Sequence, residues 1–287
     1  MSHIENKNHG LLLAVASPLC FATFNAGLRI VSAQITIYGL MFLRGLVGMA
    51  LVLIISKLMN LKLNKNRKLF LLSIGFVSAF STVATTTAIT LIPLYQAVVI
   101  LYLYPAITVP LGYVLGGDKI TPRSLAGVVA AIIGCVLLVW PDSQAGLNLH
   151  YGHAIGLLGA TLYALSFIMT RKLGSGYSGL EPFFTYSLAS FLISWPLSKI
   201  IYDGLGIDNQ GEVLLGLALV WLGAAAQLMA FAALRFLPPF RVGVIGTLEV
   251  LLGALCSWLL FNDPFTVRAL IGAIIIVYAA FGFGERK

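Results

Sequence analysis

Apolar residues dominate ten stretches of the chain, and short polar segments separate these stretches from one another. Each stretch is roughly 18 to 22 residues long, enough for a helix to cross a hydrocarbon core of about 30 Å. Their approximate centres are Cys20, Val47, Phe80, Pro105, Ile132, Leu162, Phe191, Ala224, Leu251 and Ile275. The pattern predicts an all-α membrane protein with ten transmembrane helices, which we number spans one to ten.

The segment at residues 88–127 recurs later in the chain. At an offset of 145 positions the matching pairs are Pro93 and Pro238, Asp118 and Asp263, Thr121 and Thr266, Arg123 and Arg268, Leu125 and Leu270, and Gly127 and Gly272. Earlier positions agree at an offset of 142, as in Arg29 with Arg171 and Phe42 with Phe184. Self-similarity sustained through loops and spans indicates an internal repeat. We predict one five-helix repeat at residues 1–145 and a second at 146–287.

Five spans per repeat have a topological consequence. Because five is odd, the second repeat enters the membrane from the opposite side, so the two repeats are inverted. Inverted repeats are typical of secondary transporters, in which both halves build a midplane site that is exposed alternately to each side. The sequence therefore predicts alternating access through a central cavity.

The formal net charge is +8, and the basic residues flank the spans. On the side of the N-terminus lie Lys7, Lys57, Lys62, Lys65, Arg67, Lys68, Lys119, Arg123, Arg171, Lys172, Arg235, Arg241, Arg286 and Lys287. The other side receives Arg29, Lys199 and Arg268. This asymmetry predicts a multi-pass protein of the cell inner membrane with both termini cytoplasmic, and it indicates lipid rather than nucleic acid as the surroundings. A membrane-impermeant thiol reagent should label a cysteine at Ser143 but not at Asn64.

Polar and aromatic side chains gather on spans one, three, four, six, eight and nine, whereas spans five and ten are aliphatic and suit a scaffold or a dimer contact. The cavity candidates are Ser17, Phe21, Phe24, Asn25, Ser78, Thr82, Gln96, Tyr102, Tyr163, Ser166, Trp221 and Gln227. Ordinary helix packing is the alternative interpretation, since Ser, Thr and Asn also bond between membrane helices. Aromatic walls with amides and hydroxyls suit a small-molecule substrate that is largely uncharged or zwitterionic, such as an amino acid.

Two ionisable residues lie deep within spans. Arg44 in span two is costly unless it faces the protein interior or water, or snorkels to the interface. Glu249 lies near the middle of span nine, where it could carry protons, pair with a cation, or act as a structural acid beside Arg44. The residues leave these roles open, and with them the choice between proton coupling, exchange with a counter-substrate and uniport.

Proline and glycine distinguish spans four and nine. Pro105 and Pro110 predict a kinked or loosened helix near residues 100–102, because proline removes a helix hydrogen bond. Span nine carries Gly243, Gly246 and Gly253 instead.

The chain carries no G-x-S-x-G, H-E-x-x-H or Walker motif, so we predict no catalytic residue, cofactor or metal site. His150 and His153 lie at a span end and are interpreted as interfacial polar caps. A competing hypothesis is an intramembrane lipid-modifying enzyme that uses Glu249 with Tyr102 or Tyr104. The repeat counts against it, since catalysis does not require a matching second half.

Several motifs resemble the drug/metabolite transporter superfamily, EamA type. These are residues 42–44 (F-L-R), residues 117–121 (G-D-K-I-T) and residues 248–250 (L-E-V), where Val250 replaces the family's proline. The resemblance implies an inner-membrane carrier, often an exporter of amino acids, other metabolites or drugs, and working as a monomer or homodimer. It also implies that Arg44 and Glu249 belong to the scaffold. Loss of the proline leads us to expect a straighter span nine.

Overall fold

The protein is helical throughout the residues that the computed structural model describes, which are 3–31, 36–64, 66–92, 94–116, 121–139, 150–174, 176–202, 210–261 and 266–282. In the first half the helices are α1 (His3–Val31), α2 (Ile37–Leu58), α3 (Lys68–Leu91), α4 (Leu94–Leu101), α5 (Tyr104–Leu111), the π-helical turn η1 (Gly112–Gly116) and α6 (Pro122–Val139). In the second half they are α7 (Tyr151–Lys172), α8 (Leu180–Tyr202), α9 (Gln210–Ala233), α10 (Pro239–Gly246), α11 (Leu248–Phe261) and α12 (Val267–Gly282).

These helices supply the ten predicted spans. Seven helical segments of the described chain are long and apolar enough to cross a membrane, with α4 to η1 forming one segment and α10 with α11 another. The apolar helices α6 and α12 are shorter. The remaining span is α8, which has 23 residues and buries the polar side chains Ser187, Ser190, Ser194 and Ser198 against its neighbours. The predicted fold class is confirmed.

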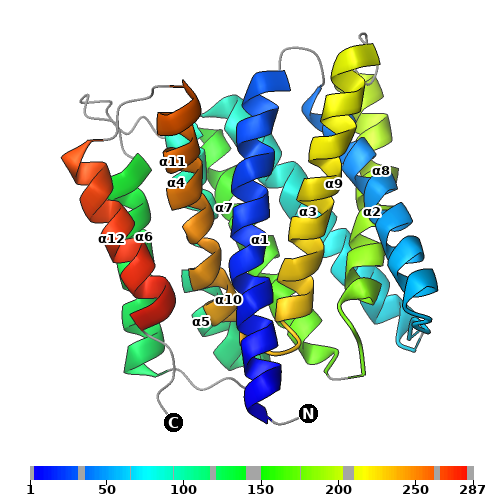
Figure 1. Ribbon diagram of the computed structural model, residues 1–287, viewed down its shortest axis with the longest axis horizontal. Coiled ribbons are helices and arrows are strands. Elements are labelled where there is room, and N and C mark those ends of the chain that lie inside the picture. Colours follow the sequence, from blue (N-terminus) through cyan, green and yellow to red (C-terminus); the bar gives the residue numbers. More distant parts are fainter. Residues whose placement is uncertain are drawn as a thin grey trace.

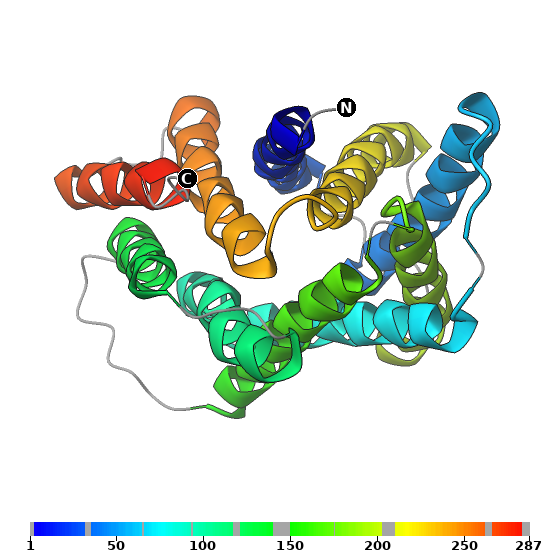
Figure 2. The ribbon, with the colours of Figure 1, turned by 90° about the horizontal axis from the view of Figure 1, so that it is seen from below.

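The packing of the helices repeats between the two halves. Helix α1 lies along α9, and its repeat counterpart α7 lies along α3. Helix α2 packs against α8, and α6 packs against α12, so in these two pairs each helix contacts its own counterpart. The two pairs lie at opposite ends of the molecule (Figure 2). This exchange of partners is what a two-fold axis in the membrane plane generates.

The direction of the helices shows the inversion. Helix α1 begins at the end of the bundle where both termini lie, and α7 runs the opposite way (Figure 1). The predicted boundary between residues 145 and 146 lies outside the described residues and stays a prediction.

Spans four and nine are both broken near their middle. Span four stops being helical at Tyr102 and Leu103, as the prolines predicted. Span nine is interrupted at Thr247, between α10 and α11. The expectation that loss of the proline makes span nine straighter stays a prediction. Tyr102 and Thr247 are 145 positions apart, which makes the two breaks equivalent in the repeat.

The second break has no proline within it, and two hydrogen bonds to backbone carbonyls lie beside it. The hydroxyl of Thr247 donates to the carbonyl of Val244 at 2.6 Å. The hydroxyl of Tyr104 donates to the carbonyl of Gly243 at 3.2 Å and so takes up a backbone acceptor near the break. A Cβ on Gly246 would lie 2.5 Å from that hydroxyl, so only glycine lets Tyr104 approach so closely.

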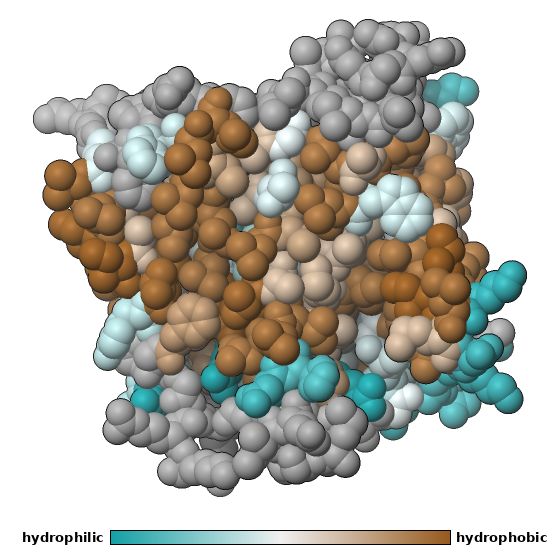
Figure 3. Space-filling view, in the orientation of Figure 1, coloured by the Kyte–Doolittle hydropathy of each residue, from teal (hydrophilic) through white to brown (hydrophobic). Residues whose placement is uncertain are grey.

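The outer surface is a belt of apolar side chains, with hydrophilic residues gathered below it at the end where α1 begins (Figure 3). Exposed basic residues of the described chain at this end include Lys57, Lys62, Lys68, Arg171, Lys172 and Arg235. The arrangement is that of a multi-pass membrane protein.

Candidate functional site

A polar cluster lies where the two repeats meet. The side-chain amide of Asn25 in α1 donates from Nδ2 to Oε1 of Glu249 at 2.9 Å. The hydroxyl of Tyr102 forms a second hydrogen bond with the same carboxylate. The first repeat therefore supplies both donors and the second supplies the acid.

The helix breaks place two members of this cluster. Tyr102 is the residue at which span four stops being helical, and Glu249 lies in the first turn of α11, just beyond the break at Thr247. The first turn of a helix favours a negative charge, because unpaired backbone N–H groups and the helix dipole are concentrated there. A carboxylate in the middle of span nine thus gains stabilisation that an unbroken helix would not provide.

Arg44 lies beside this cluster without pairing with it. Its guanidinium carbon lies 5.2 Å from the ring centre of Phe24 and 5.8 Å from that of Phe21. Its Nε is buried and has no hydrogen-bond partner among the described residues. The charge of Arg44 acts on Glu249, but no ion pair joins the two among the contacts found in the described chain. The guanidinium is thus held inside the protein by aromatic rings, a favourable contact for a cation.

A cavity of about 20 Å³ adjoins Glu249. Its wall consists of Ala14, Ser17, Pro18, Phe21, Tyr104, Tyr163, Phe167, Ala230, Val242, Gly246 and Glu249. These residues come from α1, α5, α7, α9, α10 and α11. The space admits about one water molecule, so no organic solute fits the cavity in this arrangement.

Aromatic rings close the cavity on the side of the chain termini. The rings of Tyr104 and Tyr163 are 4.8 Å apart, and those of Tyr163 and Phe167 are 4.6 Å apart. Phe167 then contacts Phe231, with 6.4 Å between ring centres. We call Tyr104, Tyr163, Phe167 and Phe231 the aromatic layer. Tyr163 is fixed further by a hydrogen bond with the side chain of Gln227.

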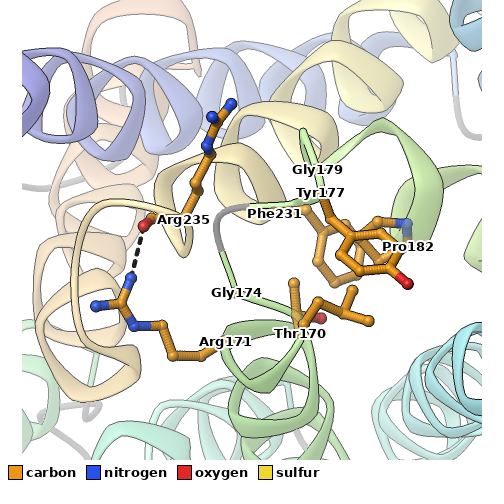
Figure 4. Close-up of a pocket in the computed structure, with 9 residues that line it drawn as sticks. Thr170, Arg171, Gly174, Tyr177, Gly179, Pro182, Phe231 and Arg235 are labelled. Carbon is orange, nitrogen blue, oxygen red and sulfur yellow. Dashed lines mark hydrogen bonds between the residues drawn. The ribbon is translucent and has the colours of Figure 1, made fainter. Parts of the chain in front are cut away.

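A larger pocket of about 340 Å³ lies beyond the aromatic layer, at the end of the bundle that carries the basic residues. Its lining residues are Thr170, Arg171, Leu173, Gly174, Tyr177, Gly179, Pro182, Phe231 and Arg235 (Figure 4). Phe231 belongs to both the pocket and the aromatic layer. Phe231 lines this pocket of solute size, Phe167 lines the central cavity, and the two rings contact each other.

Arg171 shapes this pocket by holding the end of α9. Its Nη1 donates to the carbonyl of Leu234 at 2.9 Å and to the carbonyl of Arg235 at 2.6 Å, and Figure 4 marks the second of these bonds. The last carbonyls of a helix have no partner within the helix, so a cation that binds them stabilises the helix end.

The structure brings together some of the predicted cavity residues. Ser17, Phe21 and Tyr163 line the central cavity, Asn25 and Tyr102 bind Glu249, and Phe24 contacts Arg44. Gln227 is buried against Tyr163. Their part in substrate binding stays a prediction.

Other candidates lie apart from this group. The hydroxyls of Ser78, Thr82 and Ser166 donate to carbonyls one turn back on their own helices, at 2.8, 3.0 and 2.8 Å. Trp221 is 38% exposed on the outer part of α9. No α3 residue is part of the cavity wall, although span three was expected to contribute.

Gln96 has a different position again. Its Oε1 lies 2.9 Å from Nε2 of His153, at the first turn of α7. His150 and His153 form a reciprocal capping box at the start of α7, which confirms that they act as polar caps. The contact ties α4 to α7 at the end of the bundle opposite the termini.

The sequence analysis did not single out Tyr104, Phe167 and Phe231 as one layer. Phe167 aligns with Asn25 at the offset of 142, and this alignment was the available signal for its location in the site. Phe231 carries no such signal, because its contact with Phe167 depends on how α7 packs against α9.

Two inverted five-helix repeats, with polar residues from both at helix breaks in the membrane interior, define a membrane transporter of the inverted-repeat class. The chain belongs to the EamA-like transporter family, which matches residues 8–140 and again residues 150–284. This confirms the resemblance that the motifs indicated.

Relatives and a solved structure agree with this assignment. The pseudopaline exporter CntI of Pseudomonas aeruginosa is 23% identical over 279 residues, covering 97% of this chain and 96% of the exporter. An uncharacterised transporter of Archaeoglobus fulgidus is 23% identical over 201 residues, covering 69% of this chain and 70% of that protein. A crystal structure superposes with a TM-score of 0.79 at 19% identity, covering 94% of this chain and 96% of the other, which shows a shared fold.

Proposed function

We propose that this protein is a secondary transporter of the inner membrane that exports a small organic solute, such as an amino acid or a related metabolite. The observation that carries the proposal is the polar cluster of Asn25, Tyr102 and Glu249, which both repeats build at the breaks of spans four and nine. Broken helices with polar groups near the bilayer midplane are the usual substrate sites of inverted-repeat carriers. The name of the Pseudomonas aeruginosa relative supports export as the direction.

The two unequal cavities support alternating access as the mechanism. The pocket beside Arg171 is of solute size, the central cavity is not, and the aromatic layer lies between them. In this proposal the structure represents a state closed toward the side of the termini, and movement of Phe167 and Phe231 admits solute from that side. In this proposal Asn25, which is exposed, lies on the side of the site that is open in this state.

Flux into proteoliposomes tests the proposal directly. Purified protein is reconstituted, and uptake of radiolabelled amino acids and metabolites is compared with that of empty vesicles. We expect counterflow of at least one solute, which saturates with concentration. If no member of the panel moves faster than in empty vesicles, transport of such solutes is excluded.

The driving force is measured in the same vesicles. Glu249 is a candidate proton carrier, because it is an acid near the middle of a span. If protons drive export, an imposed pH gradient accumulates solute against its own gradient. Equal internal and external solute at steady state, with the pH gradient maintained, indicates exchange or uniport instead.

A further inference from the structure

Two opposite charges lie close together in the central site without forming an ion pair. Phe21 lies near both, because its ring centre is 5.8 Å from the guanidinium carbon of Arg44 and its side chain lines the cavity that Glu249 adjoins. The two charges interact electrostatically. Both lie in membrane-spanning helices, and both are half-buried in the protein.

Neither charge is fully satisfied by the protein. A guanidinium has five N–H donors, and Arg44 has aromatic faces in place of acceptors, with its Nε left without a partner among the described residues. An orphan donor of this kind requires an explanation, since nearly all buried donors are paired. On the other side, the carboxylate of Glu249 accepts from Asn25 and Tyr102, and a carboxylate has about four acceptor positions.

The hydrogen-bond donors around the site decide whether Glu249 and Arg44 accept or donate further hydrogen bonds. Asn25 and Tyr102 both direct hydrogen-bond donors at Glu249, so the carboxylate acts as an acceptor and keeps room for a further donor. Arg44 has donors alone and lacks an acceptor. The site thus presents an acceptor at Glu249 and, within the described chain, an unpaired donor at Arg44, and the ring of Phe21 lies against the guanidinium.

We propose that Arg44 and Glu249 bind the two ends of a zwitterionic solute, with its carboxylate on Arg44 and its ammonium group on Glu249. The proposal rests on the transport function argued above and specifies its substrate class. An apolar side group of the solute would lie against Phe21 and Phe24, whose rings lie beside the guanidinium of Arg44.

Charge balance selects a zwitterion over singly charged solutes. The pair of Arg44 and Glu249 is neutral as a whole, and a zwitterion leaves the filled site neutral while supplying a partner to each member. An anion would satisfy Arg44 but add repulsion at Glu249, and a cation would do the reverse. Because an uncompensated charge within the membrane is costly, either one would be disfavoured.

The size of the present cavity sets one condition. At about 20 Å³ it cannot hold an amino acid, so the bound state needs a wider separation of α1 from α10 and α11. Arg44 and Glu249 lie on different repeats, and the movement that opens the site would also change the distance between them.

The test compares a zwitterion with analogues that lack one charge. The probes are L-phenylalanine, phenethylamine and 3-phenylpropanoate, followed by L-leucine, 3-methylbutylamine and 4-methylpentanoate, each measured by counterflow in proteoliposomes. We expect the wild-type protein to prefer the zwitterion of at least one set over both of its analogues by more than about tenfold, since a site built for a polar group rejects ligands that lack it.

Variants of Arg44 and of Glu249 should each lose the preference for the zwitterion over one of its two analogues. In Arg44→Gln we expect the counterflow rate of the zwitterion to fall more than about tenfold, while the rate of the amine does not fall in parallel. Arg44→Lys should recover part of the counterflow rate of the zwitterion. In Glu249→Gln the zwitterion falls in the same way while the carboxylic acid does not. Lys57→Gln removes a charge from the exposed end of the same helix as Arg44 and keeps the wild-type preference.

The outcomes separate this proposal from the transport function. Flux of the zwitterion and both analogues at similar rates, or an equal loss of all three in Arg44→Gln and Glu249→Gln, means that the charges serve the scaffold while transport itself stands. A variant that no longer yields monodisperse protein is replaced by Arg44→Lys or Glu249→Asp, whose altered selectivity decides in the same way. No flux of any zwitterion by the wild-type protein overturns this proposal, and flux of other solutes would still support a carrier.

Discussion

Gly179 and Gly174 show how a single residue can be required for two separate reasons. Both have positive φ, +94° and +78°, a backbone conformation that side chains other than glycine rarely adopt. A Cβ on Gly179 would also lie 2.8 Å from the Cα of Ala232, whereas a Cβ on Gly174 meets nothing within 4 Å. Only Gly179 therefore combines backbone strain with a collision against α9.

We expect Gly179→Ala to destabilise the protein more than Gly174→Ala. Both changes cost about 1–3 kcal/mol of backbone strain, and Gly179→Ala adds about 1–3 kcal/mol because the backbone of Ala232 cannot move aside freely. Thermal unfolding in detergent, followed by the loss of monodisperse protein, measures the difference. Equal loss in the two variants would show that the contact with α9 relaxes.

Glu181 gives a second prediction at this scale. Its buried carboxylate accepts from the backbone N–H of Asn64 at 3.1 Å, and from the N–H and hydroxyl of Ser178 at 2.9 and 2.8 Å. Glu181→Ala leaves two backbone donors without this acceptor and should cost about 1–3 kcal/mol for each donor that water cannot reach. Ser178→Ala removes the hydroxyl, which also accepts from the N–H of Leu180 at 3.3 Å, so it leaves one backbone donor rather than two without an acceptor and should cost less. A Ser178→Ala variant as unstable as Glu181→Ala would contradict this account.

The sequence predicted the location of charged residues better than their partners. An arginine at the depth of Arg44 had to face inward or snorkel, and it faces inward. Its partners are the rings of Phe21 and Phe24 rather than Glu249, because the relative rotation of α1 and α2 decides which side chain it meets. That rotation depends on the packing of several helices and cannot be read from one span.

At the scale of the elements, the two broken spans are held together by Tyr104. Its hydroxyl donates to the carbonyl of Gly243 and would be 2.5 Å from a Cβ on Gly246, while the next nearest atom of Tyr104 to that Cβ is 3.8 Å away. A Cβ on Gly243 instead meets ring carbon Cε2 of Tyr104 at 3.0 Å and Pro105 Cβ at 3.1 Å. The two glycines thus contact different parts of one tyrosine.

This difference predicts a selective suppressor. Gly246→Ala alone should lose about 1–3 kcal/mol from overpacking, and Tyr104→Phe alone about 0.5–1.5 kcal/mol from the lost hydrogen bond. The double variant should recover stability relative to the sum, because the clashing oxygen is gone. Gly243→Ala should gain no such relief from Tyr104→Phe. Thermal unfolding of the double-mutant cycles measures both couplings, and additive behaviour at Gly246 would contradict the contact.

The breaks of spans four and nine differ in how far the sequence of each span predicts them. The prolines of span four remove backbone hydrogen bonds within that span, so its break could be predicted locally. Span nine was expected to be straighter because Val250 stands where a proline was expected. At its break Thr247 bonds to Val244, and Tyr104 of the other repeat bonds to Gly243. The second of these is a contact between distant spans, which no property of span nine alone indicated.

At the scale of the whole molecule, the repeat in the sequence predicted the packing of the helices. Residue pairs at a fixed offset implied five spans per half, and five spans per half required inversion. The structure adds which helices meet, with α2 against α8 and α6 against α12. The close approach of α6 and α12 at Gly134 and Gly272 occurs within one chain, where a Cβ on Gly272 would lie 2.7 Å from the carbonyl oxygen of Gly134. Gly134 and Gly272 thus serve packing between two helices of the same chain.

The last prediction concerns the orientation of the molecule in the membrane. Most flanking basic residues lie at the end that carries both termini, so that end should be cytoplasmic. The structure refines the labelling position, because the Asn64 side chain is half-buried and donates to the carbonyl of Gly176 at 3.1 Å, whereas Lys62 on the same loop is exposed. In a background without Cys20, Cys135 and Cys256, a cysteine at Ser143, outside the described residues, should react with an impermeant thiol reagent in intact cells. A cysteine at Lys62 should react only after the membrane is permeabilised. Labelling at Lys62 in intact cells with protection at Ser143 would reverse the orientation and turn the proposed exporter's solute-sized pocket outward.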